Sequence, residues 1–100
     1  MKKILLALAF FFVVGAKAQQ IKPSSEDGKI IFKMNCARCH GYDGKLGFLG
    51  AKNLQISKLD DGQLSKIVAN GKWRMPKWKK VLTPEEISAV VTYVKTLRKN

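Results

Sequence analysis

Apolar residues recur at helical spacing in three parts of the chain. The clearest case lies near the C-terminus, where one apolar face is formed by Ile87, Val90, Val91, Val94 and Leu97. Thr83 and Glu86 precede this face as a capping box, and Pro84 suits the first helical position. The pattern predicts a helix that begins after Thr83 and continues to the end of the apolar face.

Two further helices are predicted upstream. Residues 61–70 carry an apolar stripe, and Gly71 directly after them suits a helix end. Residues 25–38 have Ser24 or Ser25 as a candidate N-cap, and Glu26 and Asp27 lie in the first turn, where the helix dipole favours acids. Residues 41–57 are rich in glycine and lysine and are predicted to be a loop. Because no segment alternates as a strand does, the fold is predicted to be all-α.

The N-terminus has the pattern of a secretory signal peptide. Two lysines precede an unbroken apolar run at residues 4–14, and residues 16–18 form an A-x-A cleavage pattern. The run is short against the ~20 residues of a spanning helix, so we expect cleavage after Ala18, with a membrane tether by an uncleaved signal as the alternative. The expected organisation is a signal peptide at 1–18, a polar leader at 19–24 and one domain at 25–100, exported to the periplasm.

Composition narrows the chemistry of this domain. The chain has 100 residues, with 19 basic and 7 acidic side chains and a formal charge of +12; without residues 1–18 it has 82 residues and a charge of +9. A domain this small often needs a disulfide, a metal or a cofactor for stability. With two cysteines and one histidine, the chain cannot supply four Cys/His ligands to a zinc ion.

Cys36, Cys39 and His40 form a C-x-x-C-H sequence, the attachment signal of c-type haem. Thiols three residues apart lie on one side of a helical turn, where each can form a thioether with a haem vinyl group. The adjacent histidine can then bind the iron. A thioredoxin-like site needs a βαβ context that is missing, and a Cys36–Cys39 disulfide closes too small a loop to stabilise much. We expect one covalently bound haem c with its iron; a chance match is the remaining alternative.

A longer pattern surrounds this pentapeptide. Gly28, Phe32 and Cys36 lie four residues apart on one predicted helical stripe. With CARCHG, AKNL, NGKWRMPKW and VVTYVKTL, they make nearly the whole chain after the signal resemble the class I cytochrome c family. The resemblance implies a small cytochrome c fold, with three to four helices around one covalently attached haem. It also implies crossing N- and C-terminal helices, with Gly28 and Phe32 facing Tyr93.

Under this resemblance, His40 is the proximal iron ligand and a methionine is the distal one. His40 is the only histidine, so bis-His ligation within one chain is excluded. Met34 lies two residues before Cys36 and cannot easily reach the opposite haem face. Met75 precedes Pro76 ahead of the last helix, which is how this family presents its distal ligand. A closed six-coordinate His/Met iron favours electron transfer over oxygen activation.

Other residues are candidate haem contacts. Trp78 is the better candidate, and Trp73 and Asn53 are the others. The apolar residues expected to line or flank the pocket are Leu46, Phe48, Leu49, Leu54, Leu59, Leu64, Ile67 and Val68. Unlike many members, which use a proline carbonyl to accept the imidazole N–H, this chain has no proline after the haem motif until residue 76. The sequence therefore leaves open the hydrogen-bond partner of His40.

Basic side chains crowd around Met75, namely Lys72, Arg74, Lys77, Lys79 and Lys80. If Met75 is at the haem, this cluster rings the haem edge and steers the protein to acidic surfaces of a redox donor and acceptor. The alternative is an ordinary solvated basic face. An anionic membrane surface is a secondary partner. Nucleic acid is not expected, because no binding motif accompanies the charge, and a monomer is expected.

The leading hypothesis is therefore an electron-transfer protein of a respiratory chain, a one-electron carrier that is not an enzyme. One alternative is a haem subunit or domain of a larger oxidase or dehydrogenase complex. A less favoured alternative is a ligand-binding haem protein, which would require Met75 to be absent from the iron or labile.

Overall fold

The computed structural model describes residues 24–99. This part of the chain contains four α-helices: α1 (Ser25–Asn35), α2 (Ala37–His40), α3 (Asp61–Asn70) and α4 (Pro84–Thr96). Three short 3-10 helices lie between them: η1 (Phe48–Gly50), η2 (Leu54–Ile56) and η3 (Trp78–Lys80). Since these 76 positions contain helices and no strand, the all-α prediction is confirmed. The expected signal peptide and all but the last leader residue lie outside the described residues.

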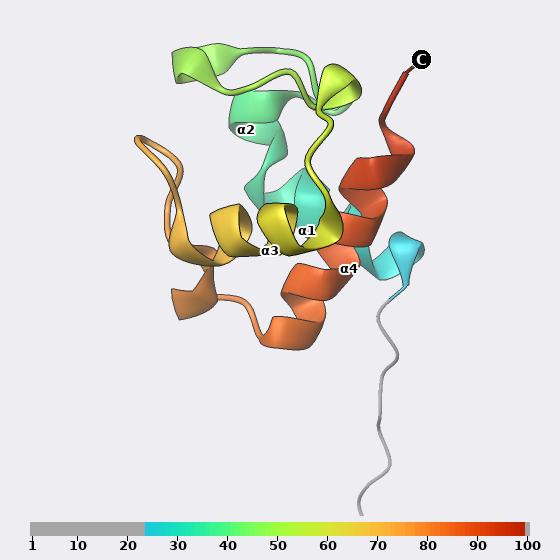
Figure 1. The fold of residues 1–100 in the computed structure, drawn as a ribbon, viewed down its shortest axis with the longest axis vertical. Helices are drawn as coiled ribbons and strands as arrows, with labels where there is room; N and C mark the ends of the chain where they lie inside the picture. Colours follow the sequence, from blue (N-terminus) through green and yellow to red (C-terminus); the bar gives the residue numbers. More distant parts are fainter. Residues whose placement is uncertain (1–23, 100) are drawn as a thin grey trace, which may run out of the picture.

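The first and last described long helices cross in close contact (Figure 1). Gly28 of α1 is buried at the crossing, where an added Cβ would overlap the carbonyl group of Ala89 and lie 2.9 Å from the Cβ of Tyr93. Beside this contact, the rings of Phe32 and Tyr93 have centroids 5.4 Å apart. The predicted crossing at a glycine and an aromatic pair is confirmed, because only a residue without a side chain permits this approach.

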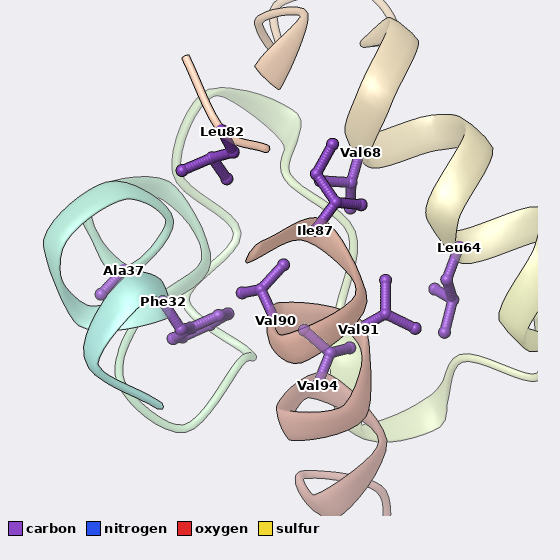
Figure 2. Packing of buried hydrophobic residues seen from close by; sticks show 9 residues of the cluster. All are labelled: Phe32, Ala37, Leu64, Val68, Leu82, Ile87, Val90, Val91 and Val94. Atoms are coloured by element: carbon purple, nitrogen blue, oxygen red, sulfur yellow. The ribbon is translucent and has the colours of Figure 1, made fainter. Parts of the chain in front are cut away.

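Helix α4 lies at the centre of the core and packs on both sides. In Figure 2, Val90 extends toward Phe32 of α1, whereas Val91 extends toward Leu64 of α3. Phe32 and Val90 are the largest side chains that are almost completely buried among the described residues. The apolar face predicted for the last helix is therefore split between two neighbours, and α4 joins α1 to α3.

The helix ends agree with the sequence except at α1. Thr83 and Glu86 form the predicted capping box of α4, and Asp60 and Gln63 form a second one before α3 that was not predicted. Helix α1 ends at Asn35 rather than at residue 38. The Asn35 side-chain amide donates to a carbonyl of the preceding turn, a competition with the backbone that makes asparagine a poor helix former.

The segment between α2 and α3 is tied to the end of α4. The backbone N–H of Lys99 donates to the carbonyl of Gln55 at 2.8 Å, and the Arg98 guanidinium donates to the carbonyl of Leu59. A salt bridge of 2.6 Å between Lys95 and Asp61 adds a link from α4 to α3, although such an exposed pair stabilises little. These bonds fix the predicted loop, in which η1 and η2 are the only helical turns.

None of the helices in the described part of the chain is both long enough and apolar enough to span a membrane.

Candidate functional site

The two cysteines and the histidine lie in one tight turn at the junction of α1 and α2. The N–H of Cys36 donates to the Phe32 carbonyl at 2.8 Å, and the Cys36 carbonyl accepts from Cys39 and His40 at 3.2 and 3.0 Å. Both thiols are free and half-buried. Burial raises the pKa of the Cys36 thiol to about 11, and the adjacent Cys39 shifts it in the same direction. The backbone thus gathers all three reactive side chains within five residues.

The His40 imidazole has a defined hydrogen-bond partner. Its Nδ1 lies 3.0 Å from the carbonyl oxygen of Lys52. Because a carbonyl only accepts, Nδ1 carries the proton in this bond, and the neutral ring keeps a lone pair on Nε2. Burial lowers the pKa of His40, and the bond to Lys52 partly offsets this shift. This is the form of histidine that binds a metal.

The fold of the loop after the pentapeptide explains how the Lys52 carbonyl reaches the ring. Leu46 N–H donates to the His40 carbonyl at 2.9 Å, and Leu54 N–H donates to the Gly44 carbonyl at 2.8 Å. Gly44 is buried with a φ of 87°, and a Cβ there would press on Leu54 at 3.1 Å. Sequence reasoning missed Lys52, because a backbone carbonyl leaves no signal in the residue type.

Met75 closes a short hairpin between α3 and η3. Lys72 N–H donates to the Met75 carbonyl at 3.2 Å, and Met75 N–H donates to the Lys72 carbonyl at 2.9 Å. Trp73 and Arg74 form the turn between them, and Trp73 has a φ of 58°. The Met75 side chain is half-buried and packs against the core. Met34, by contrast, is 77% exposed on α1.

Gly71 fixes how this hairpin leaves α3. It is the C-cap of α3 with a φ of 73°. A Cβ at Gly71 would lie 2.5 Å from the carbonyl oxygen of Met75 and 2.9 Å from the carbonyl carbon of Pro76. A side chain at this position would therefore displace the segment that carries Met75, in addition to straining the backbone. Gly71 was predicted only as a helix end, and its contact with Met75 emerges from the structure.

The structure brings some of the predicted site residues together and leaves others apart. Cys36, Met75 and Trp78 all pack against the same core cluster, although they lie up to 42 positions apart in the chain. Trp73 is 94% exposed and packs on nothing in that cluster. Asn53 is also exposed, and its side-chain oxygen accepts the N–H of Gln55 at 2.9 Å as the cap of η2.

The apolar residues predicted to surround the site fall into two groups. Leu64 and Val68 are buried in the core, whereas Ile67, Leu54 and Leu59 are half-buried. In the loop after the pentapeptide, the predicted residues Leu46, Phe48 and Leu49 each expose more than half of their surface. Ile56, which was not predicted, is also more than half exposed. All four of these exposed apolar side chains lie between residues 46 and 56.

The predicted basic cluster is exposed at all five positions: Lys72, Arg74, Lys77, Lys79 and Lys80. The single ion pair found within residues 24–99 joins Lys95 to Asp61, so none of these five is neutralised by an acid of the described chain. The segment from Gly71 to Pro84 contains no acidic residue. Positive charge therefore gathers around Met75.

The sequence of this chain is similar to those of several known proteins. Residues 23–94 match the family model "Cytochrome C oxidase, cbb3-type, subunit III". Cytochrome c6 of Rippkaea orientalis is 35% identical over 92% of this chain and 91% of its own length. Cytochrome c6 of Anabaena variabilis is 41% identical over 70% of this chain and 87% of its own length.

A third relative is much longer than this chain. The cbb3-type cytochrome c oxidase subunit FixP of Azorhizobium caulinodans is 38% identical over 75% of this chain, but the match spans only 28% of FixP. The likeness to FixP therefore concerns one part of that subunit. The family match, over residues 23–94, includes the C-x-x-C-H pentapeptide and nearly all of the two helices that cross. The chain belongs to the class I c-type cytochromes, monohaem electron carriers in which haem c and its iron are covalently bound.

Proposed function

We propose that this protein is an exported one-electron carrier whose haem c is attached to Cys36 and Cys39 and whose iron is ligated by His40 and Met75. When bound, the haem supplies a reversible one-electron couple between ferric and ferrous iron. The chain's own residues would hold the ring and supply both iron ligands. Its basic face receives the redox partners.

The observation that carries this proposal is the hydrogen bond from His40 Nδ1 to the Lys52 carbonyl, at 3.0 Å. It sets the tautomer in which Nε2 is free to bind iron, and it limits rotation of the ring. A carbonyl acceptor also makes the imidazole a stronger donor to the metal. An unligated surface histidine would need no such partner twelve residues away.

The distal side is supported by the Met75 hairpin. The side chain of Met75 packs against the same core cluster as Cys36, and Gly71 allows the close approach that sets its backbone. With the Met75 thioether and the His40 imidazole both on the iron, no open site would remain for oxygen or peroxide. This arrangement favours electron transfer over the ligand-binding alternative.

The surroundings fit a large apolar ring. Leu46, Phe48 and Ile56 expose more than half of their surface, and a porphyrin that covered them would gain about 25 cal/mol per Å² of apolar surface removed from water. Trp78 is half-buried and carries an N–H that suits a propionate. The roles predicted for Asn53 and Trp73 have less support, because Asn53 already caps η2 and Trp73 lies almost wholly in water.

We further propose that residues 1–18 act as a signal peptide cleaved after Ala18, which delivers the domain at 25–100 to the periplasm. The apolar run at residues 4–14 and the A-x-A pattern support this reading. Mass spectrometry of the exported protein, which would begin at Gln19 if the signal is cut there, tests this step.

Partners are proposed to be redox proteins with acidic docking surfaces. The five exposed bases around Met75 lie in a segment without acids, so they present a coherent positive field. Such a field raises the rate of encounter with an acidic surface at low salt. Contact with an anionic membrane is a secondary proposal from the same charge.

The substitution Met75→Ala tests the ligand assignment in protein matured with its haem. We expect the haem to stay attached, the absorption band of a methionine sulfur on ferric iron to vanish, and the reduction potential to fall. Rapid binding of carbon monoxide to the reduced variant would show the opened position. Met34→Ala is the matched control, because Met34 is 77% exposed on α1 and should leave band and potential unchanged. A Met75→Ala protein with the wild-type potential contradicts the assignment.

A second candidate function is a haem subunit of a larger oxidase complex. The match to a cbb3-type subunit family supports it, and so does the 38% identity to part of FixP. Gentle solubilisation and size-exclusion chromatography of the native protein distinguish the two functions. Elution with other oxidase subunits favours the complex, whereas elution as a free small protein favours the carrier.

A further inference from the structure

Trp73 combines two unusual properties. Its side chain is 94% exposed, more than any other large apolar residue in the described chain, and its backbone φ is 58°. The left-handed region destabilises a bulky L-residue, and the exposed indole gains no free energy from burial that could offset this cost. Neither packing nor backbone preference explains a tryptophan at this position. Outliers of this kind occur where a function maintains them.

The position of Trp73 in the fold suggests what that function is. Lys72 and Met75 are joined by two hydrogen bonds, so Trp73 is the first residue of the turn at the hairpin tip. Figure 1 shows this hairpin, which follows α3, extending away from the helices as a narrow loop. Lys72 and Arg74 flank the indole directly, and three more exposed lysines follow within seven residues.

We infer that Trp73 is the apolar anchor of a docking surface for an acidic redox protein, with its indole entering an apolar recess on the partner's surface. The inference rests on the proposed function, because only a haem-bound Met75 makes this hairpin a site of electron exchange. A tryptophan surrounded by charged residues has the composition of an interface hot spot. The bases speed the encounter, and burial of the indole slows dissociation.

A protein partner fits this surface better than a membrane. Trp73 is the only large apolar side chain exposed between residues 71 and 80. Loops and helices that insert into lipid bring several apolar side chains to the boundary between headgroups and acyl chains. One indole within a ring of bases can instead be matched by one recess within a ring of acids. Charge complementarity therefore identifies the partner as an acidic protein.

Stopped-flow kinetics with a defined probe tests the inference. The reduced holoprotein is mixed with an acidic plastocyanin, a copper protein chosen for its acidic surface and the apolar patch beside its metal. One electron passes from the reduced protein to Cu(II), which becomes Cu(I), and no proton or group moves. The variant is Trp73→Asn, because asparagine tolerates the left-handed turn and keeps the hairpin while removing the indole.

We expect Trp73→Asn to lower the second-order rate constant about tenfold or more at physiological ionic strength. The rate with ferricyanide, a small oxidant without an apolar recess, should stay at the wild-type value. Ile30→Ala is the matched control, since Ile30 is an exposed apolar side chain on α1 and its loss should change neither rate. The wild-type rate with plastocyanin should also fall as salt is added.

Three results would overturn the inference. The first is an equal plastocyanin rate for Trp73→Asn and the wild type. The second is an equal loss of rate with ferricyanide, which would place the effect on the haem site rather than on docking. The third is a loss confined to binding of vesicles of phosphatidylcholine and phosphatidylglycerol, which would assign Trp73 to a membrane. A different result would contradict the proposed function itself: the wild-type protein would then show no reversible one-electron redox titration.

Discussion

The segments that carry the two proposed iron ligands are built in opposite ways. His40 lies at the end of α2, and its ring is held by a carbonyl twelve residues further along the chain. Met75 lies in a hairpin whose two backbone bonds span only four residues, beginning at Lys72. The His40 side is thus fixed by contacts between distant parts of the fold, whereas the Met75 side depends on local bonds and on Gly71.

Because of this contrast, the domain should tolerate substitutions in the Met75 hairpin better than substitutions around His40. A local hairpin can be displaced without unfolding the rest of the domain, because its bonds do not support other elements. The loop that holds His40 is tied through Gln55 and Leu59 to the end of α4. Damage to the pentapeptide side should therefore affect the whole fold, and damage to the hairpin should affect ligation and docking.

The largest effect is expected from removal of the thiols on the His40 side. The double variant Cys36→Ala/Cys39→Ala should lose covalent haem and leave the chain largely unfolded, since the ring completes a small core. Haem staining after denaturing electrophoresis and acid–acetone extraction measures attachment, and circular dichroism measures folding. Arg38→Ala is the control within the same pentapeptide. Haem that resists extraction from the double variant would contradict the attachment through these cysteines.

The next effect should come from Gly71→Ala on the Met75 side. The new Cβ meets the Met75 carbonyl and strains the backbone, so we expect a loss of at least about 2 kcal/mol of stability or release of the methionine from iron. Haem attachment through the pentapeptide should remain. Denaturant unfolding and the methionine–iron absorption band are the measurements.

A second glycine, Gly50, distinguishes the effect of backbone strain from the effect of the contact with Met75. Gly50 has a φ of 82°, but a Cβ there would meet nothing within 4 Å. Gly50→Ala should therefore cost about 1 kcal/mol through the backbone alone and leave the methionine–iron band intact. Equal losses of stability and equal methionine–iron bands in the two variants would show that the close approach of Gly71 to Met75 affects neither stability nor ligation.

The smallest effect concerns Trp73, and its sign is opposite. Trp73→Asn relieves a left-handed tryptophan and should raise the free energy of unfolding by about 0.5–1 kcal/mol, while it weakens docking. Thermal and denaturant unfolding of the oxidised holoprotein measure the gain. A loss of stability would mean that the indole supports the hairpin, and the tip would then be structural.

Much of the fold was predictable because its signals are local. The capping box of Thr83 and Glu86 fixed the start of α4, and the glycine–aromatic pattern of Gly28 and Phe32 pointed to the helix crossing. The early end of α1 was not predicted, because the hydrogen bond from the Asn35 side chain to the preceding turn leaves no mark in the helical periodicity. The capping box of Asp60 and Gln63 is visible in the residue types alone, because a glutamine follows the aspartate by three positions.

The sequence alone identifies the candidate reactive groups: two thiols and an imidazole at fixed spacing, one methionine before a proline, and a basic segment around it. These are properties of side chains, so their identity is visible in the residue types. The folded chain was needed to show that the Lys52 carbonyl orients His40, that Gly71 makes room for Met75, and that Trp73 is exposed whereas Trp78 packs against the core. Those features depend on backbone atoms and on contacts across the fold, which any residue type can supply and no pattern records.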